Sequence, residues 1–159
     1  MHPITGLDHV AAMVAVGLWG GILGKPSLWL LPITFPLVMC LGATLGIAGI
    51  PFPGVETGIA LSGIVLGSMV LFAVRPPLWL SMTLVGIFAM FHGYAHGAEL
   101  PNSANPVGYA AGFVLATSTL HLIGIAIGQL YEWPAGKVVV RVVGAAIALA
   151  GGAFLTGFA

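Results

Sequence analysis

Hydrophobic residues form long unbroken stretches in this chain and do not alternate with polar ones. Between polar or Pro/Gly-containing breaks, the stretches reach about 20 residues, the length that crosses a bilayer as a helix. They cover residues 7–24, 28–50, 56–74, 77–97, 107–131 and 136–157. Continuous apolar runs favour a helical bundle over a membrane β-barrel. The pattern therefore predicts an all-α, polytopic membrane protein with six transmembrane helices, and the short connections predict one domain over residues 1–159.

Composition supports a membrane protein. Of the 159 residues, 59% are hydrophobic and 5% are charged, whereas soluble domains carry roughly 25% charged residues. The formal net charge is zero and no charged tail is present, so we expect the lipid bilayer, and not nucleic acid, as a partner. The one cysteine, Cys40, excludes an internal disulfide. Met1-His2-Pro3 does not look like a signal peptide, so either the chain inserts without one or Met1 stands where one was removed.

The charges also predict an orientation. The basic residues follow the first, third and fifth predicted helices: Lys25, Arg75, Lys137 and Arg141. All four would lie on one side, which the positive-inside rule makes cytoplasmic, so both termini would face outside. The tryptophans lie near the same inner helix ends, where an interfacial belt is expected: Trp19, Trp29, Trp79 and Trp133.

Two polar segments interrupt this apolar chain. Near the end of the fourth helix, His92, His96 and Glu99 are spaced four and three residues apart, so their side chains share one face. The first helix opens with His2, Asp8 and His9. Thr5-x-x-Asp8 also fits a helix capping box, which would give Asp8 a structural role. In the predicted topology both segments lie in the outer half of the membrane, which suggests one site between the first and fourth helices.

These six residues offer imidazole nitrogen and carboxylate oxygen without a thiolate, a donor mix that suits Ni(II), Co(II), Zn(II) or Cu(II). The alternative is a polar network that ties two helices together. Ionisable groups near mid-membrane cost roughly 2.5–3.5 kcal/mol each, which favours a functional site. Six donors are more than a tetrahedral zinc ion needs, so some would support the ligands or belong to a neighbouring site.

Further polar and small residues have two interpretations each. His121, ~20 Å below the outer start of the fifth helix, is a second station for the ion or a histidine bonded to a helix carbonyl. Ser and Thr along the second, third and fifth helices line a polar path or bond to backbone carbonyls. Met13, Met39 and Cys40 are better explained by packing than by metal binding. Glycines four residues apart predict close helix contacts: Gly17/Gly21, Gly20/Gly24, Gly42/Gly46, Gly63/Gly67, Gly108/Gly112 and Gly124/Gly128.

His2-x5-Asp8-His9 and Phe91-His92-Gly93-x-Ala95-His96-Gly97-x-Glu99 resemble the two signature motifs of the HupE/UreJ family of nickel/cobalt permeases, and the resemblance spans the chain. It implies a multi-pass protein of the bacterial inner membrane that takes up Ni(II) and in some members Co(II). It also implies that the motif residues are needed for transport: His2, Asp8, His9, His92, His96 and Glu99. Family precursors usually begin with a cleavable signal peptide. The resemblance assigns no role to His121.

The leading hypothesis is therefore metal uptake without a resident cofactor, in which the outer site passes an ion between the first, fourth and fifth helices. No P-loop is present, so transport is secondary, facilitated or coupled to a partner. Imidazoles bind metal when neutral, so uptake should fall below about pH 6.5. An alternative is a zinc-dependent intramembrane hydrolase with Asp8 or Glu99 as base, although no H-E-x-x-H motif occurs. A third is a b-type haem protein with axial histidines. The sequence leaves the physiological ion, the energy source and the oligomeric state open.

Overall fold

The helices begin and end where the hydrophobic pattern breaks. A computed structural model describes residues 6–100 and 105–157, and within these residues every regular element is helical. The α-helices are α1 (Leu7–Leu23), α2 (Ser27–Ile47), α3 (Val55–Leu71), α4 (Leu78–Ala98), α5 (Pro106–Gly128) and α6 (Pro134–Thr156), with a 3₁₀ helix η1 (Gln129–Glu132) before α6. Gly24 and Gly157 end α1 and α6 at a φ of +74°, a backbone conformation that glycine adopts without strain.

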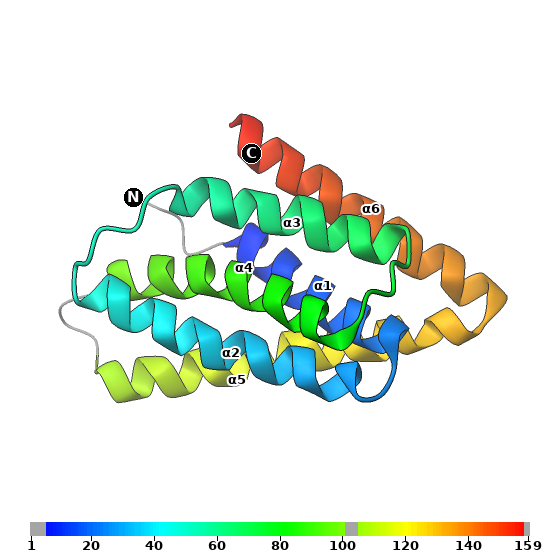
Figure 1. The fold of residues 1–159 in the computed structure, drawn as a ribbon, viewed down its shortest axis with the longest axis horizontal. Coiled ribbons are helices and arrows are strands. Elements are labelled where there is room, and N and C mark those ends of the chain that lie inside the picture. Colours follow the sequence, from blue (N-terminus) through cyan, green and yellow to red (C-terminus); the bar gives the residue numbers. More distant parts are fainter. Residues whose placement is uncertain (1–5, 101–104, 158–159) are drawn as a thin grey trace.

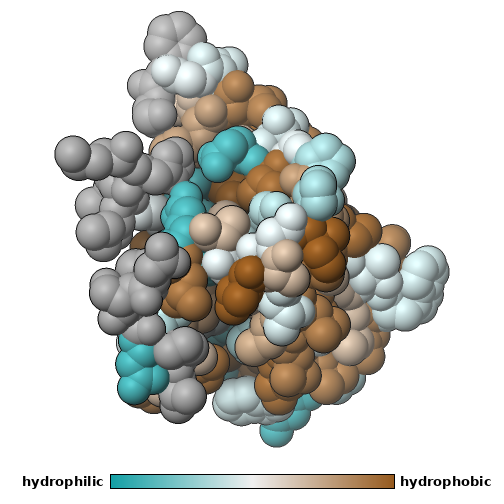
Figure 2. All heavy atoms as spheres, turned by 90° about the vertical axis from the view of Figure 1, so that its left-hand side faces the viewer, coloured by the Kyte–Doolittle hydropathy of each residue, from teal (hydrophilic) through white to brown (hydrophobic). Residues whose placement is uncertain are grey.

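Successive helices run back and forth between two ends of the molecule (Figure 1). One end contains the start of α1, the start of α3 and the end of α4, and it therefore contains Asp8, Glu56 and Glu99. The other end contains the α1–α2, α3–α4 and α5–α6 connections and the start of α6. The exposed basic side chains lie at this end, Lys25 and Arg75 in the first two connections and Lys137 and Arg141 in α6. Figure 2 faces the first end and shows hydrophilic residues among the hydrophobic ones. The segregation of basic residues at one end agrees with the sequence-based expectation.

Four of the helices are long and apolar enough to cross a membrane: α2, α4, α5 with its 3₁₀ extension, and α6. The helices α1 and α3 are apolar but have 17 residues each, at the lower limit of about 17 for a spanning helix. The all-helical fold predicted from the hydrophobic pattern is therefore confirmed, with four helices long and apolar enough to cross a membrane. The prediction that all six helices cross it stays a prediction.

Glycine contacts join the helices into three tight pairs, α2–α4, α3–α6 and α1–α5. A Cβ atom built on one of these glycines would meet backbone atoms of the partner helix. This holds for Gly17, Gly21, Gly124 and Gly128 between α1 and α5, for Gly42, Gly46, Gly93 and Gly97 between α2 and α4, and for Gly67, Gly144 and Gly151 between α3 and α6. Small side chains allow this approach in lipid, where the hydrophobic effect does not drive helices together. Among the other predicted pairs, a Cβ on Gly20 would be in ordinary contact with the α2 backbone at Ser27 and Leu28, from 3.4 Å, whereas Gly24, Gly108 and Gly112 meet no backbone of another helix.

Gly93 offers a direct test of this packing because it lies between His92 and Tyr94 on α4. A methyl group there would overlap the Met39 carbonyl oxygen of α2, so Gly93→Ala should force the two helices apart and cost about 1–3 kcal/mol. Gly86 on the same helix has only a Val38 methyl group near its added Cβ, at 3.8 Å, so Gly86→Ala should stabilise the helix by about 0.5–1 kcal/mol. Thermal unfolding in one detergent would compare them. Equal stability of both variants would contradict this account of the α2–α4 contact.

The prediction of an interfacial belt is wrong for Trp19. Its side chain is 0% exposed and belongs to the hydrophobic core, where its Nε1–H donates a hydrogen bond to the Val74 carbonyl oxygen at 2.9 Å. The bond satisfies the indole donor within the bundle, so the ring does not need interfacial water. Trp29, Trp79 and Trp133 are at least half exposed, as the belt requires.

Candidate metal site

Asp8 and His9, in the first turn of α1, are linked by hydrogen bonds. The Asp8 Oδ1 atom accepts hydrogen bonds from the His9 backbone N–H at 2.8 Å and from the His9 ring Nδ1 at 2.9 Å. An ionised carboxylate is an acceptor, so the ring proton lies on Nδ1 and the lone pair lies on Nε2. That Nε2 is buried and lacks a hydrogen-bond partner within residues 6–100 and 105–157. A carboxylate that fixes the tautomer in this way is the usual support of a metal-binding histidine.

His92 of α4 is oriented from the opposite side by α3. The Ser62 hydroxyl donates to the Ile59 carbonyl oxygen at 2.6 Å, and the His92 Nε2 atom lies 2.8 Å from the same hydroxyl oxygen. Because the hydroxyl proton is already used, Nε2–H of His92 must be the donor, which leaves the lone pair on Nδ1. The His92 ring is 0% exposed. Its Nδ1 has no hydrogen-bond partner in the described part of the chain.

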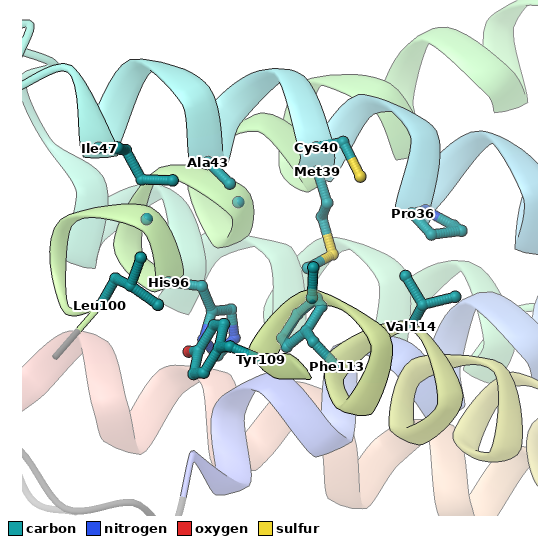
Figure 3. Close-up of a pocket in the computed structure, with 13 residues that line it drawn as sticks. Pro36, Met39, Cys40, Ala43, Ile47, His96, Leu100, Tyr109, Phe113 and Val114 are labelled. Atoms are coloured by element: carbon teal, nitrogen blue, oxygen red, sulfur yellow. The ribbon is translucent and has the colours of Figure 1, made fainter. Parts of the chain in front are cut away.

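His96 lies one turn beyond His92 and borders a cavity. Its ring packs on Phe113 of α5 with 4.4 Å between centroids, and its Nε2 is a third buried ring nitrogen for which the described residues provide no partner. The cavity has a volume of about 110 Å³ and lies between α2, α4 and α5. Figure 3 shows His96 at its wall together with apolar and aromatic side chains, among them Met39, Leu100, Tyr109 and Phe113.

The three histidine rings lie against one another. The centroid of His9 is 4.5 Å from that of His92 and 4.4 Å from that of His96. The helices α1 and α4 are not one of the closely packed pairs, so the rings themselves bridge the space between them. Among the described residues no three His, Cys, Asp or Glu side chains are already arranged around one point as metal ligands.

The other residues predicted for the site take no part in the printed ring contacts of the three histidines or lie outside the described residues. Glu99 directly follows the last residue of α4 and is exposed. His2 and Thr5 lie outside the described residues. The part of His2 in the site and the capping box of Thr5 and Asp8 therefore stay predictions. His121 is buried in α5, 2% exposed, and its ring packs on Phe35 and not on the three-histidine cluster.

Two residues next to the cluster could not be recognised from the sequence. Ser62 holds the His92 ring, and Phe35 places its ring 5.6 Å from that of His92 and 5.5 Å from that of His121. Met13 and Met39 are buried in the hydrophobic core, which agrees with a packing role. Cys40 is exposed and borders the cavity beside His96.

Comparison with known proteins identifies relatives over nearly the whole chain. The model of the family described as HupE / UreJ protein matches residues 1–154. A protein named Protein HupE, from Rhizobium leguminosarum bv. viciae, is 51% identical over 156 residues, which is 98% of this chain and 82% of that protein. No solved structure matches the chain.

Proposed function

The chain belongs to the HupE/UreJ family, and from this membership together with the histidine cluster we propose that it takes up divalent transition metal ions across the bacterial inner membrane. Ni(II) is the proposed substrate, with Co(II) and Zn(II) as the alternatives that the same donors would accept. The metal is cargo and not a resident cofactor. The comparisons give the hydrolase alternative no support.

The observation that carries the proposal is the set of buried ring nitrogens of His9, His92 and His96. Each lacks a hydrogen-bond partner among the described residues, although an unsatisfied buried polar group costs about 1–3 kcal/mol. Three such groups on adjoining rings are explained by a ligand that pairs with them. A divalent cation fits, because two of the nitrogens carry lone pairs fixed by the hydrogen bonds to Asp8 and Ser62.

The proposed path begins where α1 starts and α4 ends. There an ion would exchange water for imidazole nitrogens, first at His9 and His96, which are partly exposed, and then at His92, which is fully buried. The Asp8 carboxylate would offset the positive charge of the ion beside His9. Glu99, exposed at the end of α4, and His2 would act earlier, at the entrance. The ion would then pass inward between α1, α4 and α5.

We propose six membrane spans with both termini outside, and an orientation that the basic residues set. In a Cys40→Ser background, a cysteine at Ile50 in the α2–α3 connection should react with a membrane-impermeant maleimide added to intact cells. A cysteine at Lys25, at the opposite end, should react only after the cells are lysed. Both positions are exposed, so the difference reports the side of the membrane. Labelling of Lys25→Cys in intact cells would overturn the orientation.

Uptake by purified protein in liposomes tests the function. Vesicles that contain the protein should accumulate Ni²⁺ at least about tenfold faster than protein-free vesicles, and added Co²⁺ should compete, since both metals suit imidazole donors. Ca²⁺ should not compete, because it prefers oxygen ligands. If Ni²⁺, Co²⁺ and Zn²⁺ all entered at the rate of protein-free vesicles, uptake by this chain alone would be excluded.

A further inference from the structure

A second pair of buried polar atoms lies on α5, away from the three-histidine cluster. Thr117 is 0% exposed and His121 is 2% exposed. They are four residues apart, so they lie on the same face of the helix. The Thr117 Oγ1 and the His121 Nε2 are both buried without a hydrogen-bond partner in the part of the chain that is described.

Thr117 differs in this respect from the other helical hydroxyls. Serine and threonine in apolar helices normally donate to a backbone carbonyl one turn earlier. The hydroxyls that make such a bond here include those of Thr34, Ser62, Ser68, Thr83 and Thr119. Thr119 lies two residues from Thr117 on the same helix and bonds to the Leu115 carbonyl oxygen at 2.8 Å. The Thr117 hydroxyl is therefore available to bind a ligand, whereas the Thr119 hydroxyl is already bonded.

The two prolines of α2 explain how the His121 ring is held. Pro36 has no N–H, so the carbonyl of Pro32, four residues earlier, lacks its helical donor. This carbonyl lies near the His121 ring, within reach of a ring N–H. Nε2 is the ring nitrogen without a partner among the described residues, so a ring that donates Nδ1–H to Pro32 would keep its lone pair on Nε2. Backbone carbonyls that accept the other ring N–H orient metal-binding histidines in this way.

The Thr117–His121 pair lies beyond the three-histidine cluster, with the Phe35 ring between them. The Phe35 ring contacts both histidine rings, with centroid distances of 5.6 Å to His92 and 5.5 Å to His121. The Phe35 ring thus separates His92 of the three-histidine cluster from His121 of α5. We propose that His121 Nε2 and Thr117 Oγ1 form an inner binding station for the same divalent transition metal ions. This inference rests on the proposed transport function and adds a site to it.

Two substitutions distinguish metal binding by His121 and Thr117 from a purely structural role. Asparagine at position 121 keeps an N–H donor near the place of Nδ1, so it can still bond to Pro32, but it lacks Nε2. Thr117→Val removes a hydroxyl that has no partner among the described residues, so none of the described hydrogen bonds is lost and stability should hold. His121→Asn should lower Ni²⁺ uptake at least about tenfold, and Thr117→Val should lower it several-fold. The matched control Thr119→Val should transport like the unmodified chain.

Binding of Co²⁺, followed by its visible absorption in the purified full-length protein, tests the station without transport. The His92→Ala/His96→Ala variant should retain a Co²⁺ spectrum that disappears when His121→Asn is added. The proposal of an inner station would be overturned if His121→Asn took up Ni²⁺ as fast as the unmodified chain. It would also be overturned if the Co²⁺ spectrum did not depend on His121. If the unmodified chain takes up no metal, the transport proposal fails, and the Co²⁺ spectrum alone then decides whether the station exists.

Discussion

Replacement of His92 or His96 by alanine is expected to abolish Ni²⁺ uptake, to the level of protein-free vesicles, while the protein remains folded. Both side chains contribute a buried ring nitrogen without a partner among the described residues, so each replacement removes a ligand and relieves an unsatisfied polar atom. The loss of hydrogen bonding is small. His92 shares one bond with Ser62, and the Ser62 hydroxyl keeps its own acceptor, the Ile59 carbonyl.

The two variants should differ in their effect on structure. His92→Ala leaves a void in a fully buried position, so a loss of stability of a few kcal/mol is expected. His96 borders a cavity that already exists, so His96→Ala enlarges open space and should cost less. Retained Ni²⁺ uptake in both variants would exclude the three-histidine cluster as the site of transport.

Tyr94→Phe is the matched control because Tyr94 lies between the two histidines on α4. Its ring packs on Phe52, with 5.4 Å between centroids, on a different face of the helix. The phenylalanine ring preserves this packing and removes only the hydroxyl. Uptake by Tyr94→Phe should match that of the unmodified chain, and size-exclusion chromatography in detergent should show that all three variants remain monodisperse.

The helices could be predicted from the sequence because each is a long apolar stretch that ends at glycine, proline or charge. All predicted limits fall within three residues of the observed ones, and Gly24 and Pro134 mark the end of α1 and the start of α6. Trp19 could not be placed, because its burial depends on the Val74 carbonyl, which comes from a distant turn. A tryptophan near a helix end has the same local sequence in the core and at the interface.

The candidate site could be predicted in part. Helical spacing placed His92 and His96 on one face, and the alternating topology brought His9 to the same level, which agrees with the ring contacts. The same spacing placed Glu99 on that face. Glu99 directly follows the last residue of α4 and is exposed, and its part in the site stays a prediction. Ser62 could not be singled out, because Ser62 and Ser68 lie in similar surroundings in the sequence of α3 and differ only in what the neighbouring helix presents.

Ser62→Ala is expected to weaken metal binding and uptake about 10- to 100-fold, although Ser62 is not a ligand. The Ser62 hydroxyl oxygen is the acceptor for His92 Nε2–H, and the serine is 0% exposed. Without that oxygen, the buried N–H loses its partner, which costs about 1–3 kcal/mol. The ring can recover the loss by moving its proton or by turning, and either change removes the Nδ1 lone pair from the cluster.

Ser68→Ala on the same helix supplies the control for Ser62→Ala. Its hydroxyl bonds only to the Ile64 carbonyl oxygen, at 2.6 Å, among the bonds that the structure records, so its loss should change uptake less than about twofold and stability by less than about 1 kcal/mol. Calorimetric titration with Ni²⁺ would measure affinity in both variants, and Ser62→Thr should restore binding because it returns the hydroxyl. Equal affinity in Ser62→Ala and Ser68→Ala would show that α3 does not set the tautomer of His92, and the lone pair of His92 would then need another source of orientation.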